Sequence, residues 1–329
     1  MATNNTFRVG VTLYSFTNEY LSYEMSFEDC MQKAAQLGPG EGVEIVGPQH
    51  HRCFPEVSDE FERVFKSSCE RNHLTPTSYG AYADPGLVPG RSLTDDELVE
   101  YTIPQLKGAR KLGFPVVRIQ YFLSPVIERV LPYAEKYKVK IGYELHTPLI
   151  IESPETQKLV DQVKRLQSEY FGLIPDGGIF TKSLPKLVFD AARRANVPPK
   201  IMDRLKELWT AKTGEEAARE ELKRAGADDA AMGIATLCWG LFGHSDPKSL
   251  AQIMPYIIHV HGKFYSMENG EEPNVRYEEF VKALVEGGYK GWMSSEYEGH
   301  GFAPDGDAFE LVKAHQAMVR RYIAKYAKS

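Results

Sequence analysis

Eight short segments rich in valine, isoleucine and tyrosine alternate with helical patterns along the whole chain, and this alternation restricts the fold most strongly. Several of the segments are almost continuously apolar, which is typical of parallel strands buried on both faces. Eight parallel strands joined by crossover helices close most simply into a (β/α)8 barrel. The predicted strands are residues 8–16, 42–46, 75–82, 116–121, 140–146, 170–176, 257–264 and 291–296.

The segments between the strands carry signals for helix ends. Ser26, Ser58 and Thr94 each precede acidic residues and a helical pattern, as helix N-caps do. An open sheet is the alternative to a barrel, and such sheets commonly bind nucleotides through a glycine-rich turn. No G-x-G-x-x-G run follows any predicted strand. We therefore predict a single (β/α)8 TIM barrel domain over residues 1–329.

One strand-to-strand interval is too long for an ordinary barrel unit. Strands six and seven begin at residues 170 and 257, which are 87 residues apart. The excess predicts a helical insertion over residues 181–242, after the sixth strand, with helices at 184–195, 199–211, 215–225 and 230–241. A cover over the barrel mouth and a docking surface for another subunit both fit this insertion.

Composition excludes several classes of protein. The net charge is −6, and acidic and basic residues are mixed along the chain, so no basic stripe for nucleic acid is present. No apolar run is long enough to span a membrane, and residues 1–6 are polar, unlike a signal peptide. Cys30, Cys53, Cys69 and Cys238 are widely spaced, as expected for reduced thiols. We expect a cytoplasmic protein.

Polar residues at the predicted strand ends are the candidates for chemistry, because barrel enzymes place their active sites at the C-terminal ends of the strands. The alternation of side chains along a strand puts Glu144 and His146 on the same face of strand five, and His259 and His261 on the same face of strand seven. The candidates are Glu44, Gln120, Tyr121, Glu144, His146, Asp176, His259, His261 and Glu296, with Glu298 just beyond.

Several carboxylates and an imidazole would meet at one small mouth, which is costly without a cation. The residues therefore predict a divalent metal, and the oxygen-rich donors favour Mn²⁺, with Mg²⁺, Co²⁺ or Zn²⁺ as alternatives. Asp176 could instead be a turn residue, and Glu296 could form a buried pair with Lys263. One of His259 and His261 could be a core histidine. Glu44 is expected to bind substrate hydroxyls or a cation rather than the metal.

At these positions the chain resembles the xylose-isomerase-like barrel superfamily of sugar phosphate isomerases and epimerases. In that family a glutamate ends strand five, an aspartate ends strand six, a histidine lies in an H-x-H-x-K-like run on strand seven, and a glutamate ends strand eight. The resemblance covers essentially the whole chain apart from the insertion. It implies that the metal ligands are Glu144, Asp176, His261 and Glu296.

Two departures point to a narrower relationship. Asp176 is followed by Gly177-Gly178-Ile179 without the histidine that often comes next in the family, and His146 lies two residues after Glu144. The segments VTLYSF, VEIVGP, YGAYADPG, YELHTP and LIPDGGIF resemble those of the large (α) subunits of bacterial C-glycoside deglycosidases. These enzymes cleave the carbon–carbon bond between a 3-oxo sugar and a phenolic aglycone, and they pair the barrel with a small β-sandwich subunit.

The resemblance implies a metal-dependent lyase without a redox cofactor. His146 would remove the proton at sugar C2 as a general base, Glu144 and Glu296 would contribute to catalysis as ligands of the metal, and the aglycone would leave by β-elimination. The expected substrate contacts are Tyr14, Glu44, Gln120, Tyr121 and Lys263. The first alternative is a metal-dependent ketose 3-epimerase or sugar isomerase, and the second is a non-catalytic binding partner with a degenerate site.

Overall fold

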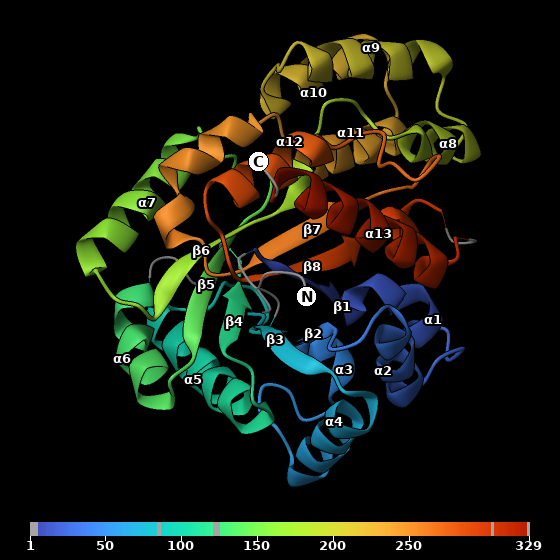
Figure 1. Ribbon diagram of the computed structural model, residues 1–329. Helices are drawn as coiled ribbons and strands as arrows, with labels where there is room; N and C mark the ends of the chain where they lie inside the picture. The colour runs from blue at the N-terminus through green and yellow to red at the C-terminus, as the bar shows by residue number, and fades with distance from the viewer. Residues whose placement is uncertain (1–5, 84–86, 121–125, 304–305, 328–329) are drawn as a thin grey trace.

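The computed structural model describes residues 6–83, 87–120, 126–303 and 306–327, and its centre is a barrel of eight parallel strands (Figure 1). Neighbouring strands follow the order β6-β5-β4-β3-β2-β1-β8-β7. Two isolated parallel bridges, Leu173–Ile257 and Asp176–His261, join β6 to the β7 side and nearly close the sheet. The (β/α)8 prediction is confirmed. The strands are β1 Arg8–Thr12, β2 Gly42–Val46, β3 Thr75–Gly80, β4 Val116–Ile119, β5 Lys140–Leu145, β6 Phe171–Pro175, β7 Val260–Phe264 and β8 Trp292–Tyr297.

Helices surround this sheet on the outside, as Figure 1 shows. The apolar core lies between strands and helices, where side chains such as Phe65, Tyr79 and Phe114 are fully buried and in ring contact. No helix in the described ranges has the length and apolar character needed to cross a membrane. The helices of the ring are α1 Thr17–Leu21, α2 Phe27–Gln36, α3 Gly47–His50, α4 Asp59–Asn72, α5 Asp95–Leu112, α6 Ile127–Tyr137, α7 Pro154–Leu166, α12 Tyr277–Glu286 and α13 Ala308–Tyr326.

The helix starts that the sequence indicates are present. The Ser26 hydroxyl accepts a hydrogen bond from the Asp29 amide at 3.1 Å, and the Asp29 carboxylate accepts one from the Ser26 amide at 2.8 Å. Thr94 makes the same reciprocal pair with Glu97 at the start of α5, and Ser58 caps α4. These caps satisfy amide groups that a helix leaves unpaired at its first turn.

Several predicted strands are shorter in the structure, and the strands predicted over residues 8–16 and 257–264 differ most. Residues 13–16 form a 3-10 helix, because the Thr12 side chain accepts from the Tyr14 amide and turns the chain out of β1. Tyr14 therefore lies on a turn at the barrel mouth. Strand β7 begins at Val260 rather than at Ile257, since a 3-10 turn at Met254–Tyr256 precedes it and Ile257 forms only a bridge.

The insertion after β6 contains the four predicted helices. They are α8 Lys186–Arg194, α9 Pro199–Thr210, α10 Glu215–Arg224 and α11 Asp229–Leu241. They pack on one another as a group at one side of the barrel (Figure 1). An antiparallel bridge between Phe180 and His244 joins the two ends of the insertion, so the group is tied to the barrel where the chain leaves and re-enters it.

Candidate active site

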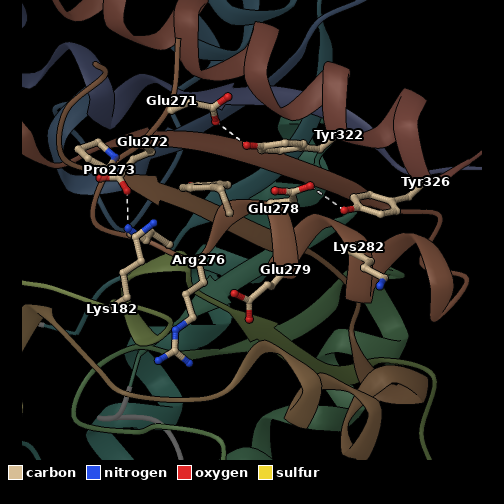
Figure 2. A pocket seen from close by; sticks show the side chains of 12 residues that line it. Lys182, Glu271, Glu272, Pro273, Arg276, Glu278, Glu279, Lys282, Tyr322 and Tyr326 are labelled. Atoms are coloured by element: carbon tan, nitrogen blue, oxygen red, sulfur yellow. Dashed lines mark hydrogen bonds between the residues drawn. The ribbon is translucent and has the colours of Figure 1, made fainter. Parts of the chain in front are cut away.

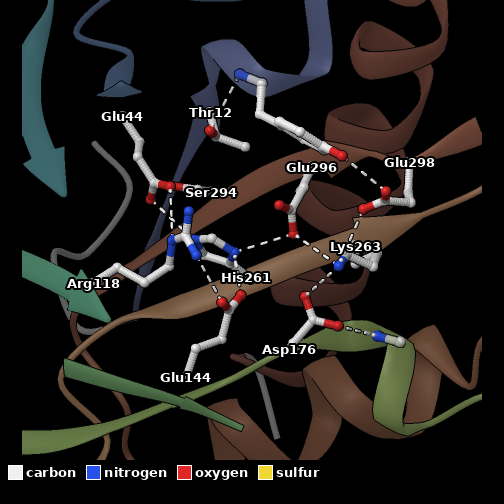
Figure 3. A network of polar contacts seen from close by, with 12 residues as sticks. Thr12, Glu44, Arg118, Glu144, Asp176, His261, Lys263, Ser294, Glu296 and Glu298 are labelled. Atoms are coloured by element: carbon white, nitrogen blue, oxygen red, sulfur yellow. Dashed lines mark hydrogen bonds and ion pairs between the residues drawn. The ribbon is translucent and has the colours of Figure 1, made fainter. Parts of the chain in front are cut away.

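The four predicted metal ligands meet at the C-terminal end of the barrel (Figure 3). Glu144 lies on β5, Asp176 directly follows β6, His261 lies on β7 and Glu296 lies on β8. One ligand atom from each residue lies within 4.8 Å of all the others, and each residue is at most 5% exposed. Four neighbouring strands therefore bring three carboxylates and one imidazole to a single point.

The His261 ring has different partners at its two nitrogens. Nδ1 lies 2.8 Å from Glu144 Oε1 and 3.1 Å from Glu296 Oε2, inside the cluster. Nε2 lies 3.0 Å from Glu44 Oε2, on the side facing β2. Burial opposes protonation, but Glu44, Glu296 and Glu144 outweigh it and raise the pKa of His261 well above its ordinary value. From its position, Nδ1 is the nitrogen that faces the other ligand atoms of the cluster.

Asp176 has an open oxygen that faces the cluster. Its Oδ1 accepts a hydrogen bond from the Gly178 amide at 2.7 Å. Its Oδ2 is buried and accepts no hydrogen bond from the described residues, although Lys263 Nζ is 3.5 Å away. Burial raises the pKa of this carboxyl well above its ordinary value. A buried carboxylate oxygen without a donor is a free-energy cost that a bound cation would remove.

Lys263 is the cation that the structure places beside these carboxylates. Its Nζ lies 3.1 Å from Glu298 Oε2 and 3.6 Å from Glu296 Oε2. Glu298 in turn accepts a hydrogen bond of 2.9 Å from the partly buried Tyr14 hydroxyl. Tyr14, Glu298 and Lys263 therefore form a polar chain that leads from the rim to the cluster (Figure 3). Glu296 contacts both Lys263 and His261. The same carboxylate therefore forms an ion pair with Lys263 and lies at one of the metal-ligand positions.

Arg118 is a site residue that our sequence interpretation missed. Its Nη1 donates a 2.8 Å hydrogen bond to Glu144 Oε2, and its Nε lies 3.6 Å from Glu44 Oε1. Gln120 donates to the same oxygen of Glu144 at 2.9 Å. A signal was available in the sequence, because an arginine within the apolar run 116–119 has no solvent to face and must find carboxylate partners inside the barrel.

His259, which directly precedes β7, and His261, which lies on β7, have different neighbours. His259 is buried, and its Nε2 lies 2.9 Å from the Ser294 hydroxyl and 3.4 Å from Glu44 Oε2. It shares a second cluster with Glu44 and His261 and does not belong to the four-residue cluster. The side chain of Glu44 is fully buried on the far side of the His261 ring. This position suits a residue that orients His261.

His146 lies at the end of β5, two residues after Glu144, and is partly buried. Its Nδ1 lies 2.8 Å from the Thr147 carbonyl, so Nδ1 carries the hydrogen and Nε2 is the acceptor nitrogen. Burial and the charge of Lys263 lower the pKa of His146 below its ordinary value. The imidazole is therefore neutral at neutral pH and able to take up a proton. Tyr121, another predicted substrate contact, falls outside the described residues.

Solved structures with the same fold include sugar-converting enzymes. An L-ribulose 3-epimerase aligns with a TM-score of 0.61 and 12% identity, over 98% of this chain and 96% of that chain. A sugar phosphate isomerase/epimerase from Parabacteroides distasonis aligns with a TM-score of 0.59 and 13% identity, over 98% and 97%. The IOLI protein, crystallised with a zinc atom, aligns with a TM-score of 0.57 and 13% identity, over 97% and 99%. At these identities the likeness concerns the fold alone.

Curated proteins of known name match at much higher identity, whereas no protein-family model matches the chain. A 3'-dehydrocarminate deglycosidase alpha subunit from Microbacterium is 40% identical, over 95% of this chain and 94% of that protein. A C-glycoside deglycosidase alpha subunit from Arthrobacter globiformis is 34% identical, over 96% of this chain and 92% of that protein. The chain therefore belongs to the family of C-glycoside deglycosidase alpha subunits.

Proposed function

We propose that the chain is the catalytic α subunit of a metal-dependent carbon–carbon lyase that cleaves 3-oxo-C-glycosides. The observation that carries this proposal is the 40% identity, over nearly the full length, to a deglycosidase whose name specifies a 3'-dehydro glycoside. The buried cluster of Glu144, Asp176, His261 and Glu296 supports the metal dependence. The neutral, partly buried His146 beside that cluster supports proton transfer.

The donor set fits a divalent ion. It offers carboxylate oxygens from Glu144, Asp176 and Glu296 with one imidazole nitrogen, and the unpartnered Oδ2 of Asp176 faces it. Hard oxygen donors with one histidine suit Mn²⁺, which we propose as the ion, and they also accept Mg²⁺, Co²⁺ or Zn²⁺. When bound, such an ion supplies Lewis-acid stabilisation of negative charge on the sugar oxygens.

In the proposed reaction, a residue of the chain itself removes the proton from the sugar. The 3-oxo group acidifies the hydrogen at sugar C2, and Nε2 of His146 accepts that proton. The electron pair forms the C1=C2 double bond while the C1–aryl bond breaks. The aryl ring carbon keeps the electron pair of the broken C1–aryl bond and receives one proton, which balances the proton taken from C2, so the products are an unsaturated 3-oxo sugar and the free phenolic aglycone. No oxidant or reductant is consumed in this step.

The remaining polar residues position the sugar in this proposal. Tyr14 and Lys263, linked through Glu298, present a hydroxyl and an ammonium beside the ligand cluster. Gln120 is partly buried next to Glu144 and can turn its amide toward a sugar hydroxyl. Tyr121 stays a predicted substrate contact. We also propose a cytoplasmic location and a small second subunit with a β-sandwich fold. The alpha-subunit names of the relatives support the existence of such a partner.

A ketose 3-epimerase or sugar isomerase is the second candidate. Glu144 and Glu296 both approach the same nitrogen of His261, so two carboxylates flank one site, as proton exchange between two faces of a sugar carbon requires. The fold of L-ribulose 3-epimerase is consistent with this arrangement. His146 is the residue that favours the lyase, because proton exchange between two carboxylates does not need a histidine.

One experiment separates the two candidates. The purified chain is analysed for bound metal and then incubated with a 3-oxo-C-glucoside, with and without the small second subunit. The lyase predicts release of free aglycone that is abolished by a chelator and restored by Mn²⁺. Incubation with D-fructose and D-psicose serves as the control. Interconversion of these sugars without aglycone release would replace the lyase by the epimerase.

A further inference from the structure

A pocket of about 480 Å³ lies beside the mouth, between the loop after β5 and the helical insertion. Its volume falls within the roughly 300–1,000 Å³ of typical small-molecule sites. Four of its lining residues are aromatic or imidazole side chains from the insertion and the segment that follows it. The residues that matter for its chemistry are Thr147, Pro148, Trp209, Trp239, Phe242 and His244.

Both walls of this pocket are attached to strands that carry the ligand cluster. Thr147 directly follows His146 at the end of β5. On the other side, the Gly243 amide donates a 2.9 Å hydrogen bond to the Gly178 carbonyl, in the turn that follows Asp176. The segment after α11 is thereby fixed against the end of β6. The pocket consequently borders the site on the side of Glu144 and Asp176.

The pocket offers aromatic surfaces beside charged lining residues (Glu152, Lys212, Glu215 and Asp246) and the buried Thr147 hydroxyl, which has no hydrogen-bond partner among the described residues. The Trp209 and His244 rings have centroids 4.0 Å apart. Each tryptophan already has a partner for its indole N–H: Trp209 donates to the Phe242 carbonyl at 3.2 Å, and Trp239 donates to the Thr213 carbonyl at 2.8 Å. Trp209 and Phe242 are buried, whereas Trp239 and His244 are partly exposed, so the rings of Trp239 and His244 can pack on an apolar or aromatic ligand in the geometry that aromatic pairs prefer.

A second pocket of similar size has a more highly charged lining. It measures about 530 Å³ and lies beside α12 and α13 (Figure 2). Charged side chains line it, and Glu278 among them pairs with Lys325 and Tyr326. Three tyrosines also line that pocket, but the hydroxyls of Tyr322 and Tyr326 donate to Glu271 and Glu278, and charged side chains surround both rings. The pocket beside β5, with two tryptophans, is therefore better suited to a flat, apolar group.

We propose that the pocket beside β5 binds the phenolic aglycone of the substrate, an inference that rests on the proposed function. A C-glycoside joins a polar sugar to a flat aromatic system, and these two parts need different surroundings. The ligand cluster with Tyr14 and Lys263 provides polar partners for the sugar. The aromatic pocket next to His146 provides the apolar surface for an aglycone of two or three fused rings. The insertion in this way supplies specificity for the leaving group.

The test uses two matched glycine substitutions within the insertion. Gly214 lines the pocket, has an extended φ of −60°, and a side chain built on it meets no atom within 4 Å. Gly214→Trp therefore adds a large side chain at the pocket lining without backbone strain. Gly233 on α11 is equally open but lies outside the described lining, so Gly233→Trp is the control. Trp239→Leu removes one aromatic face together with the indole hydrogen bond to Thr213, and serves if Gly214→Trp does not fold.

Two measurements on the metal-loaded protein read the result. Calorimetric titration with 2-naphthol and with the flavone apigenin measures binding of a free phenol. The rate of aglycone release from a 3-oxo-C-glucosyl flavone, with the second subunit present, measures kcat and KM. We expect Gly214→Trp to weaken apigenin binding and raise KM by about tenfold or more, and Trp239→Leu to do so by a smaller factor. Gly233→Trp should match the unmodified protein.

The outcomes separate this inference from the proposed function. If apigenin binding and KM are unchanged in Gly214→Trp and Trp239→Leu, the pocket does not bind the aglycone. Turnover by the same proteins would still support the lyase. Loss of phenol binding in those variants, in a protein that releases no aglycone, upholds an aromatic-ligand pocket and rejects the lyase. Loss of association with the second subunit at unchanged apigenin affinity identifies the pocket as a docking surface and also overturns the proposal.

Discussion

The order of the ligand cluster depends on how the His261 ring is held. Its Nδ1 faces Glu144 and Glu296, and its Nε2 faces Glu44 at 3.0 Å. A carboxylate on the outer nitrogen of a ligating histidine fixes the ring orientation and the tautomer, and makes the ligating nitrogen a stronger donor. Arg118 joins this arrangement, because it lies between Glu44 and Glu144. Glu44 is thus a positioning residue in our interpretation.

Replacement of this carboxylate tests that role. We expect Glu44→Gln to weaken metal affinity by about 10- to 100-fold, since the amide holds the ring less firmly and carries no charge. Competition with a chromogenic chelator measures the affinity directly. Glu41→Gln is a matched control, because Glu41 is also a buried glutamate but contacts Gln316 and Arg320 away from the cluster. Equal metal affinity in both variants would contradict the positioning role.

His146 separates metal binding from proton transfer. Its nitrogens are not part of the four-residue cluster, and its Nδ1 is engaged with the Thr147 carbonyl. We expect His146→Ala to lower turnover of a 3-oxo-C-glycoside by about 10²- to 10⁴-fold, because a general base is lost, while bound metal stays the same. Steady-state kinetics with metal analysis of the same sample measures both. Unchanged turnover would remove His146 from the mechanism.

At the scale of secondary structure elements, α13 is tied to the end of the barrel opposite the active site. Gln316 on α13 donates to the Gly10 carbonyl of β1 at 3.1 Å and also to Glu41. Arg320 donates to the other oxygen of Glu41 at 3.0 Å. Glu41 directly precedes β2 and is 2% exposed. This contact joins the last helix to the first two strands and belongs to stability rather than to chemistry.

The Glu41 contact predicts a pH-dependent stability. Burial raises the pKa of Glu41 from its ordinary 4.5 to about 7, although Arg320 opposes the shift. As pH rises from 4.5 to 7, the unfolded chain loses a proton that the folded chain keeps, so stability falls. We expect the free energy of unfolding to drop by about 3 kcal/mol relative to Glu41→Gln over this range. Denaturant titrations of both proteins at several pH values measure the difference; a constant difference would refute the raised pKa.

At the scale of the whole molecule, the relatives are named as alpha subunits, and the chain spans nearly all of their length. The second subunit that we propose would affect access to the mouth or the stability of the loops around it, because this chain already carries the ligand cluster. The insertion is a candidate for the contact, since Leu237 on α11 is 42% exposed. The insertion can serve both the partner and the aglycone, because its helices have more than one face.

Co-expression tests the need for a partner. We expect this chain and the product of an adjacent small reading frame to co-purify as a heteromer of defined mass, measured by size-exclusion chromatography with light scattering. We further expect the isolated chain to bind metal but to release aglycone at least about tenfold more slowly. Full turnover by the isolated chain would show that the partner is not required for catalysis.

The sequence by itself determined the strands, the helices, the insertion and the residue types at the strand ends. These features depend on local periodicity, capping and burial, which neighbouring residues set. Ser26 and Thr94 began helices as predicted, and Glu144 and His146 lay where strand five ends. The strand predicted over residues 8–16 was too long, because the Thr12 cap that ends it needs a turn geometry that alternation of apolar residues does not show.

Tertiary structure decided which atoms face one another. The family resemblance pointed to His261, but the choice of Nδ1 over Nε2 depends on how β7 lies against its neighbouring strands and on the orientation of the ring, which a pattern within one strand does not show. Arg118 acquired its role only when barrel closure placed it between Glu44 and Glu144. The aromatic pocket likewise forms between segments far apart in the chain. Local forces select the elements, whereas long-range packing sets the distances between their side chains, and the chemistry depends on those distances.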